Sequence, residues 1–97
     1  MLAAFSITPI GVGEDVGEQV AVAVRVIRES GLPNRTSASF TEIEGEWDEV
    51  FAVIKKATDA VMAAAGRCSI SIKADVRPGH DSMLTTKLES VERHLTQ

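Results

Sequence analysis

Apolar and polar side chains alternate along the first residues of the chain. Between residues 2 and 8, Ala3, Phe5 and Ile7 alternate with small or hydroxylated side chains, and Pro9 then ends the run. Because successive side chains of a strand point to opposite sides of the sheet, this period of two predicts a strand. One face of that strand is apolar, and the other is small and polar.

A second alternating segment, residues 68–76, is the clearest strand of the sequence. Its apolar set is Cys68, Ile70, Ile72 and Ala74, and its polar set is Ser69, Ser71, Lys73 and Asp75. We expect the first set, like Phe5 and Ile7, to be covered by helices, and the second set to face away from them. Cys68 is then a small buried side chain rather than a nucleophile.

A first helix is predicted between these strands. Asp15 and, three residues later, Glu18 predict its N-terminal cap, while Gly31 followed by Pro33 predicts its end. The residues expected on its buried stripe are Val16, Val20, Ala23, Val24 and Ile27.

A second helix is predicted just before the second alternating strand. Acidic residues between Glu44 and Glu49 complement the dipole of a helix that starts there, and Gly66 marks its end. Its expected buried stripe consists of Trp47, Val50, Phe51, Ile54, Val61 and Ala65.

A last helix follows a turn at residues 77–80. Asp81 or Ser82 is its expected N-cap. Its apolar side consists of Leu84, Leu88, Val91 and Leu95. Little core remains for this side to cover, which favours association with another subunit.

The segment between the first two helices, residues 35–44, has no helical stripe and is rich in Thr, Ser, Phe and Ile. It predicts a hairpin of two short strands with a bend at residues 38–40. The resulting order, βαββαβ with an added C-terminal helix, predicts an α+β fold of the ferredoxin-like type. We expect residues 1–97 to form one such domain, with an antiparallel sheet that carries two helices on one face and is open on the other.

The open face gathers an unusual set of side chains. Ser6, Thr8, Ser69, Ser71, Lys73 and Asp75 are expected on it. Small hydroxyls leave room for a ligand or a second sheet, and the two charged residues offer directed interactions. A plain solvated sheet face is the alternative for any one of these residues. The whole set favours a binding site or a subunit interface.

Composition limits the classes of partner. The 97 residues carry 10 basic and 14 acidic side chains, a net charge of −4, which disfavours a nucleic-acid backbone as the ligand. The chain has one cysteine, and no apolar run approaches the length of a membrane span. We therefore expect a cytoplasmic protein without nucleic-acid or membrane partners.

Motifs for catalysis or metal binding are weak. Gly11 and Gly13 follow a strand, but the third glycine of a dinucleotide loop comes one position late, at Gly17. His80 and His94 lie on different elements, which argues against a zinc site. No paired acid and base or activated nucleophile is recognisable, so we expect no enzyme activity, no metal and no cofactor.

Three stretches resemble the small thiamine-binding protein family, whose members are single-domain relatives of larger bacterial proteins that bind thiamine or its hydroxymethylpyrimidine. They are Phe5-Ser6-Ile7-Thr8-Pro9-Ile10-Gly11, Ile43-Glu44-Gly45-Glu46-Trp47-Asp48-Glu49-Val50 and Ser71-Ile72-Lys73-Ala74-Asp75-Val76-Arg77. The segment Lys87–Glu92 is similar to the family's terminal helix. The similarity spans nearly the whole chain in the same order.

The resemblance implies a ferredoxin-like fold that assembles by sheet-to-sheet contact into dimers or tetramers. It also implies a pocket for thiamine or a related pyrimidine on the open sheet face, near a subunit interface, without catalysis. The ligand-binding candidates carried over by position are Ser6, Thr8, Ser37, Glu44, Gly45, Ser71, Lys73 and Asp75. Where the family often has a proline and a glycine in the hairpin, this chain has Ala38 and Phe40, which could reshape the mouth of the pocket or supply a stacking ring.

Two alternatives remain open at this point. The chain could be a structural or regulatory homo-oligomer whose open face is a self-interface and that has no physiological small ligand. It could also be a small-metabolite enzyme of the same fold, whose available titratable residues are Glu44, Lys73, Asp75 and His80.

Overall fold

The computed structural model describes residues 1–13, 17–79 and 82–96. The elements are β1 (Leu2–Ile10), α1 (Gly17–Glu29), β2 (Asn34–Thr36), β3 (Thr41–Glu44), α2 (Trp47–Met62), β4 (Arg67–Asp75) and α3 (Met83–Leu95). This order is the predicted one. The expected N-cap of the first helix, Asp15, lies outside the described residues, as do Val16, His80 and Asp81.

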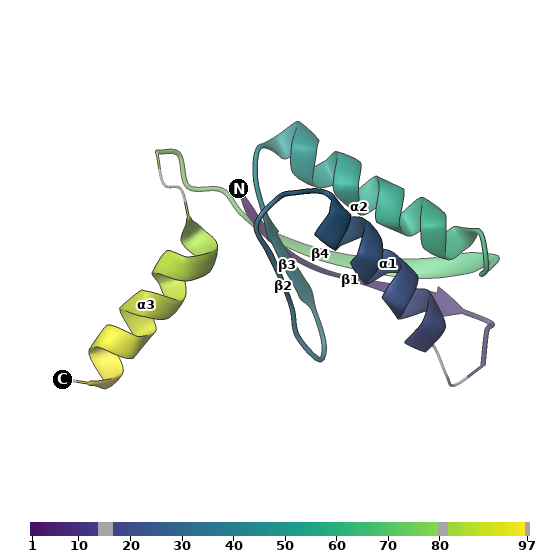
Figure 1. Cartoon of the computed structure of the whole chain (residues 1–97), viewed down its shortest axis with the longest axis horizontal. Coiled ribbons are helices and arrows are strands. Elements are labelled where there is room, and N and C mark those ends of the chain that lie inside the picture. Colours follow the sequence, from purple (N-terminus) through teal and green to yellow (C-terminus); the bar gives the residue numbers. More distant parts are fainter. Residues whose placement is uncertain (14–16, 80–81, 97) are drawn as a thin grey trace.

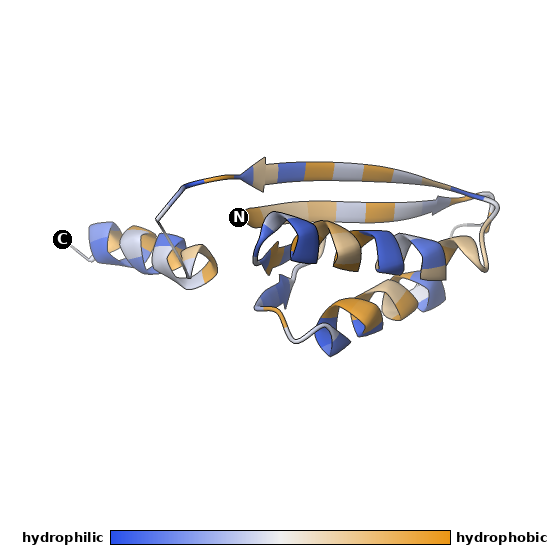
Figure 2. Cartoon of the chain, turned by 90° about the horizontal axis from the view of Figure 1, so that it is seen from above, coloured by the Kyte–Doolittle hydropathy of each residue, from blue (hydrophilic) through white to orange (hydrophobic). Residues whose placement is uncertain are grey.

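The four strands form one antiparallel sheet in the order β2-β3-β1-β4. Helices α1 and α2 lie side by side on one face of it (Figure 1). The ferredoxin-like α+β fold predicted from the alternation of strands and helices is therefore confirmed. Helix α3 stands apart and extends beyond the end of the sheet, which lengthens the molecule to 47 × 29 × 20 Å (Figures 1 and 2).

The core lies between the sheet and the two packed helices. Its buried side chains are Ala3, Phe5, Ala23, Ile27, Ile43, Val50, Ile54, Ala57 and Val61. Residues that pair directly across an antiparallel sheet share a face, so the register assigns each strand residue to the core face or the open face. Ser6 pairs with Ser71 and Thr8 with Ser69, on the face opposite Phe5. The polar set predicted for the open face is therefore gathered there.

Coverage of strand β4 differs from the prediction. Ile70 and Ile72 pair with Ile7 and Phe5 and so share the helix-covered face, yet each is 41% exposed. The physical reason is that β4 is an edge strand, so its side chains have a neighbouring strand on one side only. Cys68, on the same face, is partly buried against the core.

Two helix stripes also differ from the prediction. In α1 the buried residues are Ala23 and Ile27, whereas Val20 is exposed beside the hairpin. In α2 the buried stripe is Val50, Ile54, Ala57 and Val61, whereas Trp47 is exposed and stacks on Phe51 with ring centroids 5.3 Å apart. Trp47 is the first residue of α2 and is not part of the core cluster.

Helix α3 contacts the open face of the sheet near its N-terminal end, through its first turn and through the Lys87 side chain, which pairs with Asp75. Met83 and Leu84 pack on Leu2 in a small cluster separate from the main core. The rest of the predicted apolar side, Leu88, Val91 and Leu95, is 43%, 56% and 71% exposed. The prediction of an apolar side with little core left to cover is thus confirmed.

Candidate functional site

A cavity of about 160 Å³ lies between β1, α1 and the β2–β3 hairpin, and we call it the hairpin cavity. Its walls combine apolar side chains with hydroxyls. The lining residues are Phe5, Ser6, Ile7, Thr8, Pro9, Val20, Ala23, Val24, Ile27, Thr36, Ser37, Ala38, Ser39, Phe40 and Thr41. Three of the eight predicted ligand-binding residues, Ser6, Thr8 and Ser37, are among them.

Unequal strand lengths create this cavity. Strand β1 pairs with β3 only from Leu2 to Phe5, because β3 starts at Thr41, the partner of Phe5. From Ser6 to Pro9, β1 has a strand neighbour only on the β4 side among the described residues. The backbone edge of β1 and the side chains on either side of it therefore border the same space.

Ser37 shapes the hairpin at the far wall of the cavity. Its backbone N–H donates to the carbonyl oxygen of Phe40 at 2.9 Å, and its hydroxyl donates to that oxygen at 2.8 Å. The same hydroxyl lies 3.3 Å from the backbone N–H of Phe40 and accepts from it. Ser37 thus closes the turn that presents the exposed Phe40 ring beside the cavity. The bend predicted at residues 38–40 is confirmed.

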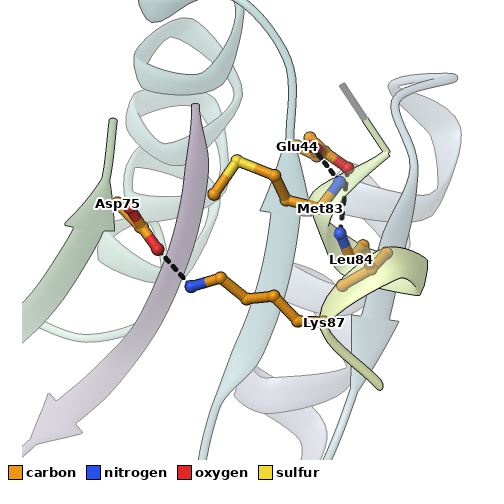
Figure 3. A network of polar contacts seen from close by, with 5 residues as sticks. All are labelled: Glu44, Asp75, Met83, Leu84 and Lys87. Atoms are coloured by element: carbon orange, nitrogen blue, oxygen red, sulfur yellow. Dashed lines mark hydrogen bonds and ion pairs between the residues drawn. The ribbon is translucent and has the colours of Figure 1, made fainter. Parts of the chain in front are cut away.

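A second cavity, of about 330 Å³, lies on the open face near the start of β1. It is lined by Leu2, Ala4, Glu42, Lys73, Ala74, Asp75, Val76 and Lys87. The carboxylate of Asp75 accepts a hydrogen bond from the Lys87 ammonium in an exposed ion pair (Figure 3). That bond, assisted by the charges of Lys87, Arg77 and Lys73, lowers the pKa of Asp75 below its usual value.

Glu44 has a role that the sequence did not reveal. Its buried carboxylate accepts the backbone N–H of Met83 at 2.7 Å and that of Leu84 at 3.2 Å, at the start of α3 (Figure 3). Two first-turn amides and the positive end of the helix dipole thus offset the cost of burying this charge. Glu44 therefore caps α3 from a strand 39 residues earlier in the chain.

Ser82 is the N-cap residue of α3, as predicted, but its hydroxyl does not do the capping. Ser82 stands at the N-cap position with left-handed backbone angles, φ 57° and ψ 33°, and makes no side-chain capping bond. Because the Glu44 carboxylate already occupies the first-turn amides, a serine hydroxyl is not needed there.

Gly45 permits close packing beside this cap. A Cβ atom at this position would lie 3.3 Å from Leu32 Cδ1 and 3.4 Å from Val50 Cγ2. The Gly45 carbonyl oxygen also accepts a hydrogen bond from the N-terminal ammonium of Met1 at 2.9 Å. Glu44 and Gly45 border a third cavity, of about 340 Å³, that also includes Leu84.

The eight predicted residues therefore fall into separate groups. Ser6, Thr8 and Ser37 line the hairpin cavity, Lys73 and Asp75 line the open-face cavity, and Glu44 and Gly45 support α3. Ser71 lies exposed on the open face opposite Ser6. The sequence placed the residues of β1 and β4 on the correct strands, whereas Ser37, expected on the second strand, lies in the turn after β2. The sequence contained no signal that the start of α3 would cover one end of the open face.

The described residues contain no group of three or more His, Cys, Asp and Glu side chains that could hold a metal ion. Within the same part of the chain, no helix has the length and apolar character needed to cross a membrane. Of the two histidines, His94 lies within the described residues, with its Nδ1 2.7 Å from the carbonyl oxygen of Ser90 in the same helix.

Comparison with known proteins identifies relatives along nearly the whole chain. The UPF0045 protein Mb1933 of Mycobacterium bovis is 56% identical over 96 residues, which cover 98% of this chain and 94% of that protein. The UPF0045 protein sll0230 of Synechocystis is 40% identical over 92% of this chain and 74% of that protein. These names state no activity.

Two solved structures share the architecture. The crystal structure of the hypothetical protein MJ1052 from Methanocaldococcus jannaschii superposes with a TM-score of 0.87 at 31% identity, covering 94% of each chain. A Thermotoga maritima protein, TM0486, described as a candidate for thiamine biosynthesis or salvage, superposes with a TM-score of 0.79 over 96% of each chain. At 19% identity, the second likeness concerns the fold alone.

The family assignment rests on a match to a whole-family profile. Residues 3–92 match the profile of the family described as "Thiamine-binding protein", which includes every strand and most of α3. The resemblance seen in three short stretches of sequence is thereby confirmed over the greater part of the chain. The chain belongs to the thiamine-binding protein family.

Proposed function

We propose that this protein binds thiamine through its hydroxymethylpyrimidine ring, without catalysis, and that the ring enters the hairpin cavity. Membership of the thiamine-binding protein family is the observation that carries the proposal. The fold neighbour from Thermotoga maritima, linked by its description to thiamine biosynthesis or salvage, adds support. Such binding suits a carrier, a buffer or a sensor of the vitamin in the cytoplasm, with no nucleic-acid or membrane partner.

The size of the hairpin cavity favours a single ring. Its volume of about 160 Å³ is close to the roughly 150 Å³ of an engineered apolar cavity that holds benzene. A pyrimidine is also a six-membered ring. The cavity has no room for the thiazolium half of thiamine in addition to the pyrimidine, so we place the thiazolium outside the cavity.

The chemistry of the walls favours a heteroaromatic ring over a purely apolar one. Phe5 and Ile27 provide buried apolar surface for the ring faces. The hydroxyls of Ser6, Thr8 and Ser37 and the edge of β1 beyond Phe5 offer donors and acceptors for ring nitrogens and an amino group. Phe40, exposed at the hairpin, can stack on the thiazolium outside, a cation–π contact of about 0.5–1 kcal/mol.

The other predicted site residues enter this proposal differently. Glu44 and Asp75 were expected to bind the ligand, but their carboxylates hold Met83, Leu84 and Lys87 of α3. We therefore assign Glu44 and Gly45 to the support of α3. Lys73, Asp75 and Ser71 remain candidates for a contact with the part of the ligand outside the cavity.

Isothermal titration calorimetry with three ligands tests the proposal. Thiamine and free hydroxymethylpyrimidine should both release heat, and the free thiazole alcohol should not. A Val20→Trp variant should weaken pyrimidine binding at least tenfold, because Val20 lines the cavity from an exposed position of α1. Ala21→Trp is the matched control, since Ala21 is exposed on the same helix but does not line the cavity.

Two results would contradict it. If neither thiamine nor free hydroxymethylpyrimidine released heat, the protein would not bind the proposed ligand. If the Val20→Trp and Ala21→Trp variants bound the pyrimidine with equal affinity, the ligand would bind at another part of the molecule and not in the hairpin cavity.

A structural or regulatory homo-oligomer is the second candidate function. The observation in its favour is the exposed apolar side of α3, formed by Leu88, Val91 and Leu95. In this alternative a second sheet or helix covers the open face, and no small ligand binds. Sedimentation that shows a stable dimer or tetramer, together with no calorimetric response, would favour it over the binding proposal.

A further inference from the structure

A cavity of about 500 Å³ lies between α3 and the segment that follows β4, and we call it the α3 cavity. Three of its lining residues are cations, namely Arg77 after β4 and Lys87 and Arg93 on α3. No Asp or Glu is among the described residues that line it. The chain as a whole carries a net charge of −4, so the charge of this cavity is opposite in sign to that of the protein.

Helical spacing brings polar side chains of α3 to this cavity. Thr86, Ser90 and Arg93 recur at intervals of four and three residues, so they lie on one side of the helix, and Lys87 adjoins that side. Side chains of a helix lean toward its N-terminus, which directs Arg93 back along α3 toward Ser90. Ser90 adds a half-buried hydroxyl to the walls. The cavity thus combines positive charge with a hydrogen-bonding group.

The two arginines of the α3 cavity are not neutralised by the described part of the chain. Neither Arg77 nor Arg93 forms an ion pair there, although Glu89 precedes Arg93 by one helical turn. A guanidinium group stays charged at any physiological pH and presents five N–H donors in a planar fork. Both arginines can therefore donate to an external acceptor.

Lys87 stands at the boundary between the α3 cavity and the open-face cavity. Its ammonium donates to the Asp75 carboxylate, which fixes the lysine side chain beside the sheet (Figure 3). That hydrogen bond is the main cause of the lowered pKa of Asp75, and the charges of Arg77 and Lys73 contribute to it. One carboxylate therefore faces three cations, and its surroundings keep an excess of positive charge that attracts anions.

We propose that the α3 cavity binds a diphosphate group, either free or as part of a small molecule. Each arginine fork can hold one phosphate group through paired N–H···O bonds, and two forks on separate elements suit two linked phosphates. The volume of about 500 Å³ lies within the range of roughly 300–1,000 Å³ that is usual for small-molecule sites. The α3 cavity shares no lining residue with the hairpin cavity, so this proposal does not rest on the binding of thiamine there.

Helix α1 offers a matched control for the arginine on α3. Arg93 lies in the last turn of α3, where a cation complements the helix dipole whether or not a ligand binds. Arg28 is exposed in the last turn of α1 and lines neither the hairpin cavity nor the α3 cavity. Loss of Arg28 therefore removes the same charge from the same helical position without changing the proposed site.

Isothermal titration calorimetry with inorganic pyrophosphate tests the proposal. Pyrophosphate should release heat and bind about tenfold or more tightly than inorganic phosphate, because it can engage both arginines. Arg77→Gln and Arg93→Gln should each weaken pyrophosphate binding about tenfold or more, since each removes charge-assisted hydrogen bonds. Arg28→Gln should weaken it less than about twofold.

Three results would overturn the proposal. They are no binding of pyrophosphate, equal affinities for pyrophosphate and phosphate, and an equal loss of affinity in Arg28→Gln and Arg93→Gln. Circular dichroism checks that the variants keep their helices. If Arg93→Gln unfolds α3, Arg93→Lys decides, because it keeps the charge at the helix end but loses the fork and should still weaken binding.

Two further titrations identify the source of the diphosphate group. Thiamine diphosphate and adenosine diphosphate are compared with inorganic pyrophosphate in the Val20→Trp variant, whose hairpin cavity is filled. An ester that binds more tightly than pyrophosphate and loses affinity with Arg77→Gln would identify a small molecule as the source, and the reverse order would identify the free anion. Pyrophosphate binding should be unchanged by Val20→Trp itself, so failure at the α3 cavity and failure at the hairpin cavity remain distinguishable.

Discussion

Two regions of the molecule are held together by different forces. One is the sandwich, in which α1 and α2 pack on the sheet, and the other is helix α3, which docks at one end of the sheet. The sandwich buries Phe5, Ile43 and Val50 almost completely, with contributions from three strands and two helices. Helix α3 is held by one buried carboxylate, two apolar side chains and an exposed ion pair. The comparison shows that burial of apolar area determines the fold, whereas a few directed polar contacts determine where the last helix lies.

The largest expected effect comes from removing core volume in the sandwich. Ile43→Ala should lower the free energy of unfolding by about 2–5 kcal/mol, because it leaves a cavity in a fully buried position. Val91→Ala, on the exposed side of α3, should change it by less than about 0.5 kcal/mol. Urea denaturation of both variants measures the difference, and a similar loss in both would show that α3 shares the core's stability.

A smaller and more local effect is expected at the cap of α3. Glu44→Gln removes the charge that accepts the amides of Met83 and Leu84, and it should weaken the docking of α3 by about 1–3 kcal/mol. Hydrogen exchange of those two amides should become roughly 10- to 100-fold faster. Glu42→Gln, two residues earlier on the same strand face, is the control and should leave both rates unchanged. If Glu44→Gln accelerated hydrogen exchange equally for amides of the sandwich, Glu44 would stabilise the whole fold.

The smallest effect concerns the exposed ion pair. Because the pKa of Asp75 is lowered in the folded protein, the pair favours folding above the usual pKa of 3.8, and this contribution is lost as the pH falls through the lowered folded value. Lys87→Met should move the pKa of Asp75 back toward 3.8, with almost no change in stability at neutral pH. NMR titration of the Asp75 carboxyl measures the shift. An unchanged titration would show that Arg77 and Lys73, rather than Lys87, lower its pKa.

The same contrast explains how much of the molecule was predictable from sequence. Strands β1 and β4 have a side-chain period of two, and the buried residues of α2 recur at helical spacing, so local patterns predicted the elements and their order. The faces of paired residues such as Ser6 and Ser71 followed from the same period. The exposure of Ile70 and Ile72 did not follow, because a strand's position at the edge of a sheet is a property of the topology.

The candidate site was predictable only in part, for a related reason. Ser6, Thr8 and Ser37 were identified by type and position, but the cavity between them depends on β3 being shorter than β1. The cap that Glu44 provides joins residues 39 positions apart, and no local pattern encodes such a contact. Glu44 was assigned to a ligand through the family resemblance, and a carboxylate near a strand end suits a cationic ligand as well as it suits a helix N-terminus.

The proposed ring site is most directly tested by a crystal structure of the protein soaked with hydroxymethylpyrimidine. We expect density for the ring between α1 and the hairpin, in contact with Phe5 and within hydrogen-bond distance of the β1 edge between Ser6 and Pro9. A ring found beneath α3 beside Asp75, with the hairpin cavity empty, would contradict the site. If the ring occupied neither place at ligand concentrations that saturate binding in calorimetry, the site would be contradicted as well.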